Sequence, residues 1–306
     1  SDEKLHGPSI DNNLRGMLSM SPFSSRCCQH NHAQGWPYYA EHLILATPDN
    51  GVAAAMYAAC KATVKVGDGN EISLHEQTNY PFEETIRFTV NTPKAVSFPF
   101  YLRIPSWTEG ATIFVNGKKV AANPEAGQYA CINREWKDND QVEIQLPMQL
   151  SMRTWQVNKN SVSVDYGPLT MSLKIDEDYV KKDSRATAIG DSKWQEGADA
   201  SQWPTYEIYA KTPWNYALVL GKNEPLKDFK VVHKEWPADN FPFTVASTPI
   251  EVKAIGRKVP SWVIDQYDLC SELPEMDAPK GEKEEITLIP MGAARLRVSA
   301  FPNTRE

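Results

Sequence analysis

The sequence predicts a mainly β protein built from antiparallel β-sandwich units, and three observations support this class. From about residue 52 onward, apolar residues recur at every second position in short stretches, which is the period of a half-buried strand. Gly, Pro, Asn and Asp separate these stretches, as in sandwiches made of many short strands. Only one segment, near the N-terminus, has apolar residues at helical spacing.

That segment is 35–51, GWPYYAEHLILATPDNG, which predicts one short helix. Pro37 suits the first helical position, where the missing N–H is not needed. The apolar residues that would share one helical face are Trp36, Ala40, Leu43 and Ile44. The closing TPDNG contains the residue types that end helices, so we expect the helix to end there.

The strands of the first half follow in order. ATVKV and EISLHE flank GDGN and predict a β-hairpin. Asn116-Gly117 is the strongest two-residue hairpin signal and predicts a second one within TIFVNGKKV. The further stretches that place apolar side chains on one face are 97–105, 140–148 and 161–167.

The character of the chain changes near residue 176, where a charged, irregular stretch predicts a boundary or a long connection. Strand patterns resume afterwards, at 215–220, 243–247, 250–255, 286–290 and 294–301. Because 306 residues exceed a typical single domain, we expect a first sandwich over 51–175, with the last strand at 286–302 as a candidate to complete it. A second β-rich domain is expected over 176–285.

Composition restricts the possible functions. The net charge is −7 and the basic residues are scattered, so nucleic acid is not an expected partner. We expect no membrane span, because the longest apolar run, VAAAMYAAC, is too short to cross a bilayer, and no signal peptide is visible. Five cysteines do not suggest a disulfide scaffold. Cys60, Cys131 and Cys270 are expected to be small buried residues.

The segment RCCQHNH stands apart because it places four thiol and imidazole groups within six residues. Zinc takes such ligands, but adjacent cysteines project in different directions, so one or two ligands completed from elsewhere is the more reasonable geometry. A cysteine next to a metal-bound one could act as a nucleophile, since the cation favours its thiolate. Two structural thiols remain an equal alternative at this point.

Several motifs in order resemble one family. RCCQHN followed by GWPYYAEHLILATPDNG is similar to the end of the catalytic domain of the β-L-arabinofuranosidase family, glycoside hydrolase family 127 and its relatives. The similarity continues through YPFEETIRFTV, FPFYLRIPSW, VNGKKV, YGPLTMSL, TPWNYAL and IPMGAARLRVSAFP. It therefore spans nearly the whole chain.

The resemblance implies an (α/α)₆ catalytic barrel followed by β-sandwich domains, with residues 1–50 as the C-terminal remnant of the barrel. It implies a zinc ion held by three cysteines and one glutamate, and a retaining mechanism with a cysteine nucleophile. Carried over by position, Cys27 would be the nucleophile and Cys28 a zinc ligand. His30, Asn31 and His32 are weaker candidates for contacting substrate; hydrogen bonding at a helix entry or solvent exposure is the alternative.

The chain departs from the family upstream of the cysteine pair. The residues before Cys27 include a single glutamate, Glu3, and no cysteine. The remaining zinc ligands and the acid/base are therefore expected upstream of residue 1. We therefore expect the C-terminal part of a bacterial, zinc-dependent glycoside hydrolase, inactive alone, with the N-terminal barrel as its partner. Plant-derived oligosaccharides or polysaccharides are the expected substrates, and a periplasmic or secreted location is expected by analogy.

The alternative is a non-catalytic carbohydrate-binding or structural β-sandwich module. In that case exposed aromatic residues would contact the glycan, and the tryptophans with this possibility are Trp107, Trp203 and Trp214. Packing inside the protein is the commoner use of tryptophan. Glu41 lies opposite the apolar side of the expected helix and is interpreted as a surface residue rather than as an acid.

Overall fold

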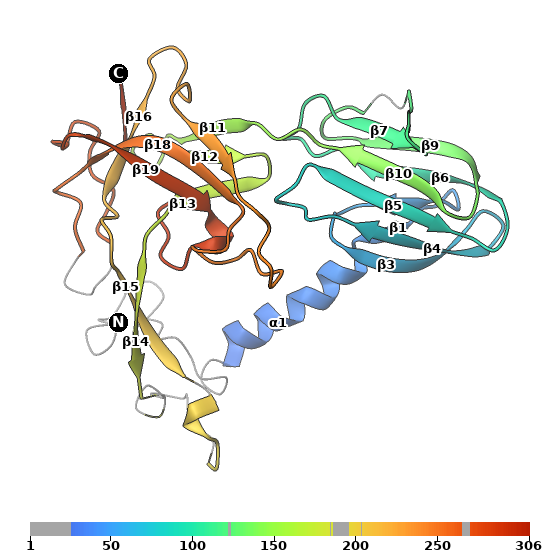
Figure 1. Ribbon diagram of the computed structural model, residues 1–306, viewed down its shortest axis with the longest axis horizontal. Helices are drawn as coiled ribbons and strands as arrows, with labels where there is room; N and C mark the ends of the chain where they lie inside the picture. The colour runs from blue at the N-terminus through green and yellow to red at the C-terminus, as the bar shows by residue number, and fades with distance from the viewer. Residues whose placement is uncertain (1–25, 122–123, 184, 186–195, 203, 265–269) are drawn as a thin grey trace. The chain divides into compact units, whose positions relative to one another are not determined.

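A computed structural model describes residues 26–121, 124–183, 185, 196–202, 204–264 and 270–306, with the backbone alone for 26–33 and 205. The described chain is mainly β, with one α-helix, so the predicted fold class is confirmed (Figure 1). Its residues divide into two compact units. One contains 34–150 and 166–169, and the other contains 151–165 and 170–306 in addition to the N-terminal residues.

Helix α1 lies earlier in the chain than expected. It covers Arg26–Glu41, so it includes the cysteine pair and holds Pro37 in its interior. The residues after it form a hairpin: β1 (Ile44–Ala46) pairs with β2 (Val52–Ala54), and Asn50 adopts a positive φ in the turn. The turn residues TPDNG therefore connect two strands instead of ending a helix. The prediction failed because Leu43 and Ile44 fit the apolar pattern of either structure.

The first unit is a β-sandwich. One sheet has the order β1-β2-β6-β9, with β6 at Val96–Arg103 and β9 at Tyr129–Trp136. The other sheet has the order β3-β4-β5-β10-β7-β8. Its strands are β3 (Cys60–Val66), β4 (Asn70–Gln77), β5 (Thr85–Asn91), β10 (Asp140–Gln145), β7 (Thr112–Val115) and β8 (Lys118–Lys119). Asn116 and Gly117 both have positive φ and form the predicted tight hairpin between β7 and β8.

The core of this sandwich is aromatic at its centre. Trp136 is fully buried, and its Nε1 donates a hydrogen bond to the carbonyl oxygen of Phe98 at 3.0 Å. Phe88 from one sheet meets Phe100 from the other with their ring centroids 5.3 Å apart. The Phe88–Phe100 contact joins the two sheets, whereas the Trp136 bond links β9 to β6 within one sheet. Burial of these side chains fixes which residues of each strand face outward, because successive residues of a strand point to opposite faces.

The second unit contains one large sheet with the order β11-β12-β13-β19-β18-β16-β20, and β17 also pairs with β18. Its strands are β11 (Leu150–Trp155), β12 (Ser161–Tyr166), β13 (Leu169–Leu173), β16 (Tyr216–Leu220), β17 (Lys230–His233), β18 (Ile250–Lys258), β19 (Lys283–Pro290) and β20 (Asn303–Arg305). Every residue of β12 and of β16 is buried. The C-terminal segment joins distant strands, since Phe301 bridges Val162 and Leu173 bonds to Val298 at 2.8 Å.

Three stretches of this unit differ from the sequence prediction. Segment 243–247 is a turn, because the hydroxyl group of Thr244 accepts a bond from the backbone N–H of Ser247 at 3.0 Å and so competes with strand pairing. The final regular strand is β20 rather than 294–301. The charged stretch after residue 176 contains the two-stranded ladder of β14 (Glu177–Lys182) and β15 (Thr205–Ala210).

The expected domain boundary near residue 175 also differs from the strand pairing. β13 pairs with β19, and β19 pairs with β18, so 169–173 share a sheet with the C-terminal strands. The candidate last strand at 286–302 contains the end of β19, which belongs to this sheet and not to either sheet of the first unit. Alternation shows which residues face a core, but it does not show which strand is the neighbour, so this pairing could not be derived from the pattern.

Candidate functional site

The predicted catalytic and zinc-binding residues lie in helix α1. Cys27 and Cys28 stand beside its first residue, and His30, Asn31 and His32 follow on the next turn. Their side chains are outside the described part of the structure. The roles of nucleophile for Cys27, zinc ligand for Cys28 and substrate contact for the other three therefore stay predictions.

The remaining described residues do not form a metal site. No group of three or more His, Cys, Asp or Glu side chains among them is placed to hold a metal ion. Cys60 is half-buried, whereas Cys131 and Cys270 are exposed, so the expectation of burial was wrong for these two. In β9 the inward positions belong to Ala130 and Ile132, which leaves Cys131 on the outer face.

The tryptophans considered as candidates for glycan contact lie in different environments. Trp107 packs against the core of the first unit, and Trp214 packs on Trp262 with ring centroids 5.1 Å apart. Trp203 lies outside the described residues. Glu41 is exposed, as interpreted from the sequence. Among the described residues, the most exposed aromatic ones are instead on helix α1, where Trp36 is 61% exposed and Tyr38 65% exposed.

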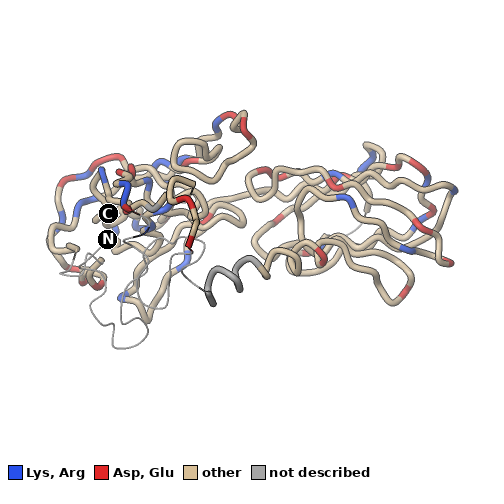
Figure 2. The backbone as a smooth tube through the Cα atoms, turned by 90° about the horizontal axis from the view of Figure 1, so that it is seen from below, with Lys and Arg blue, Asp and Glu red and all other residues tan. Residues whose placement is uncertain are grey.

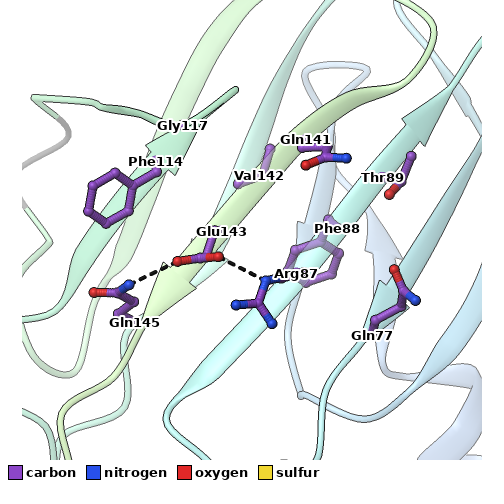
Figure 3. A pocket seen from close by; sticks show the side chains of 10 residues that line it. All are labelled: Gln77, Arg87, Phe88, Thr89, Phe114, Gly117, Gln141, Val142, Glu143 and Gln145. Atoms are coloured by element: carbon purple, nitrogen blue, oxygen red, sulfur yellow. Dashed lines mark hydrogen bonds and ion pairs between the residues drawn. The ribbon is translucent and has the colours of Figure 1, made fainter.

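A depression of about 360 Å³ lies on the outer face of the six-stranded sheet (Figure 3). Strand register builds it, because one residue from each of four adjacent strands falls in a transverse row. Gln77 pairs with Arg87, Arg87 with Glu143, and Glu143 with Phe114. We call this set of four residues the transverse row. Further lining residues are Thr89, Gln141 and Gln145, at neighbouring positions of the same strands, and Gly117 in the turn between β7 and β8.

Hydrogen bonds hold the centre of this face. The Nε of Arg87 donates to Glu143 Oε2 at 2.9 Å, and Gln145 Nε2 donates to Glu143 Oε1 at 2.8 Å (Figure 3). Thr112 Oγ1 then donates to Gln145 Oε1 at 3.3 Å. The depression carries one positive and one negative charge, so it is electrically balanced. Acidic and basic residues are likewise interspersed along the described backbone of each unit, which carries no continuous basic stripe (Figure 2).

A buried carboxyl group lies on the inner face of the same sheet. Glu76 is 1% exposed, accepts a bond from the backbone N–H of Ala58 at 3.0 Å, and has the Sγ of Cys60 at 3.7 Å from its other oxygen. Burial raises the pKa of Glu76 to about 8. Burial, followed by the nearby Glu76, raises the pKa of the Cys60 thiol to about 11. Both groups are therefore mainly protonated at neutral pH. A protonated thiol does not suit a nucleophile, because the thiolate is the reactive form.

Sequence reasoning did not identify either of these sites. Glu76 had a detectable signal, because it follows Ile72 and Leu74 at the spacing of one strand face. The transverse row had none, since its members are separated along the chain and meet only through strand register. None of the helices in the described residues is long and apolar enough to span a membrane.

Comparison with known proteins agrees with this fold. Residues 51–148 match the family model of the β-L-arabinofuranosidase GH127 middle domain. A GH127 β-L-arabinofuranosidase from Geobacillus stearothermophilus T6 is 22% identical with a TM-score of 0.59, over 91% of this chain and 37% of its own. A solved glycoside hydrolase is 21% identical with a TM-score of 0.63, over 95% of this chain and 42% of its own.

A further GH127 β-arabinofuranosidase structure is 19% identical with a TM-score of 0.59, covering 94% of this chain and 41% of that one. The chain thus spans about two fifths of the length of the solved proteins that it matches. No curated protein is similar enough to give a match. The resemblance predicted from the sequence is therefore confirmed: residues 51–148 match the middle domain of the GH127 β-L-arabinofuranosidase family, within a fold that solved enzymes of this family share.

Proposed function

We propose that this chain is the C-terminal part of a glycoside hydrolase of the β-L-arabinofuranosidase type. The match of residues 51–148 to the GH127 middle domain carries this proposal. The fold similarity to solved structures over more than nine tenths of the chain supports it. The proposed substrates are β-L-arabinofuranosides or related plant-derived glycans, and the proposed location is the bacterial periplasm or the exterior.

The finer chemistry is proposed from the cysteine pair. The Cys27 thiolate attacks the anomeric carbon, the bond to the leaving oxygen breaks, and an acid supplied upstream of this chain protonates that oxygen. Water then attacks the same carbon and gives a proton to the conjugate base of that acid, the C–S bond breaks, and the thiolate is restored with retention of configuration. Zinc is proposed with Cys28 among its ligands; the described side chains supply no ligand set, so the other ligands must come from elsewhere.

The test uses a longer polypeptide that continues upstream of Ser1, compared with the 306-residue chain. We expect the longer protein to hydrolyse an aryl β-L-arabinofuranoside and the 306-residue chain not to do so. In the longer protein, Cys27→Ser should abolish hydrolysis and leave the zinc content unchanged, whereas Cys28→Ser should lower the zinc content. Cys131→Ser, at an exposed thiol of β9, is the matched control and should change neither.

Two results would contradict the proposal. Turnover by the 306-residue chain alone would refute the argument that the site is incomplete. Full activity in the longer protein after both Cys27→Ser and Cys28→Ser would refute the assigned roles of the cysteine pair.

A further inference from the structure

We infer that the depression on the outer face of the six-stranded sheet binds a short stretch of a neutral oligosaccharide. The class of ligand rests on the proposed function, whereas the location rests on the structure. The transverse row crosses four adjacent strands in register, so its side chains form one continuous face. Two core residues, Phe88 and Val142, form part of the lining beneath them.

The face has free hydrogen-bonding capacity. The Nε of Arg87 donates its hydrogen bond to Glu143. Within the described residues, the two terminal guanidinium nitrogens of Arg87 have no hydrogen-bond partner. The side-chain amides of Gln77 and Gln141 are also without one among the residues described, and each offers both donors and an acceptor. Adjacent sugar hydroxyl groups both donate and accept, so they match a planar guanidinium or amide with two bonds at once.

The face is also held in place before a ligand arrives. Glu143 receives bonds from Arg87 and Gln145, and Gln145 receives one from Thr112. All of these residues stand on regular strands, or at their ends, over a packed core, so few side-chain rotations remain to be lost on binding. A fixed polar network of this kind favours a specific ligand over a general solvated surface.

Charge and shape select a neutral sugar over other ligands. The positive charge of Arg87 and the negative charge of Glu143 cancel, so the depression has no net charge to attract an acidic polymer or a cation. Phe114 adds an aromatic surface beside the buried Phe88, and the C–H face of a sugar ring can pack on it, whereas protein interfaces centre on clusters of large apolar anchors. A volume of about 360 Å³ is at the small end of ligand sites, which suits a short segment of a longer chain.

The test is affinity electrophoresis of the 306-residue chain in gels that contain arabinan, arabinogalactan or polygalacturonate. We expect retardation by at least one of the two neutral polymers and none by the acidic one. Arg87→Gln and Phe114→Ala should each weaken binding about ten- to a hundredfold, because each removes one main contact. Arg103→Gln is the matched control, since Arg103 is exposed on β6 of the other sheet and should leave binding unchanged.

A folding control accompanies each variant. Both changes are on the outer face of the sheet, so thermal unfolding should stay close to that of the unchanged chain. Backbone amides of Thr89 and Gln145 should also shift in NMR spectra when a neutral arabino-oligosaccharide is added, which locates binding without any substitution.

The inference is overturned if neither neutral polymer retards the chain, if polygalacturonate retards it equally, or if Arg87→Gln and Arg103→Gln behave alike. These outcomes involve no turnover, so they leave the proposed hydrolase function untouched. Loss of hydrolase activity in the longer protein would equally leave this binding measurement intact, and the two failures can be told apart.

Discussion

The buried carboxyl group of Glu76 predicts an unusual dependence of stability on pH. A glutamate has an ordinary pKa of 4.5, and burial raises the pKa of Glu76 to about 8 in the folded chain. Because the folded pKa is the higher one, the native state keeps a proton that the unfolded state releases between these two values. The free energy of unfolding therefore falls as the pH rises from about 4.5 to about 8, and this contribution is level above that window.

The size of the effect follows from the same shift. At about 1.4 kcal/mol for each pKa unit, ionising this group in the fold costs roughly 4–5 kcal/mol, a large share of the stability of an ordinary domain. Glu76→Gln removes the ionisation and keeps an oxygen that can accept the bond from the backbone N–H of Ala58. The variant should match the unchanged protein near pH 5 and exceed its stability above pH 8 by up to that amount.

Urea unfolding between pH 5 and pH 9, followed by tryptophan fluorescence, measures this difference, and the buried Trp136 contributes the signal from the core of the first unit. Glu71→Gln is the matched control, because Glu71 is an exposed carboxylate on the same strand and its loss should leave the pH profile unchanged. If the curves of the unchanged protein and Glu76→Gln stay parallel across the whole range, Glu76 is ionised in the fold and the reasoning is wrong.

Three further predictions concern the first unit. Gly51→Ala should lower the free energy of unfolding by about 1–3 kcal/mol in urea, because the new Cβ would clash with the backbone carbonyl oxygen of Pro99 on β6. Gly35→Ala, with nothing within 4 Å, is its control and should be neutral or stabilising. Trp136→Ala should cost about 3–5 kcal/mol, measured in the same way. Iodoacetamide at pH 8 should label exposed Cys131 much faster than Cys60, whose thiol has its pKa raised to about 11; equal labelling in peptide mass spectra would contradict this.

The sequence predicted the strands well where one face of a strand is buried. Segments 97–105, 112–120 and 140–148 correspond to β6, to the β7–β8 hairpin and to β10, because alternation and the Asn116-Gly117 turn are local signals. It failed where the residues fit two structures. Leu43 and Ile44 suit a helical face or a strand, and only the pairing of β1 with β2 decides between them.

Glu76 shows a different limit. Its position in the apolar phase of EISLHEQ marks it as inward-facing, so its burial could have been predicted from alternation alone. Its chemistry could not, because the pKa depends on the depth of burial and on Cys60, which lies on the neighbouring strand. A charged residue in the apolar phase of a strand is therefore a useful signal in the sequence, but the structure is needed to say what environment it meets.

The transverse row is the clearest case of a site that only register creates. Gln77, Arg87, Phe114 and Glu143 are unremarkable outward-facing residues in the sequence, and their adjacency depends on three separate strand pairings. Those pairings are held by the inward residues between them, since a slip of one position would expose the apolar set of a strand. The aromatic core thus determines the outer face as well. For this reason a variant that repacks the core should disturb glycan binding on the outer face even when every residue of the transverse row is unchanged.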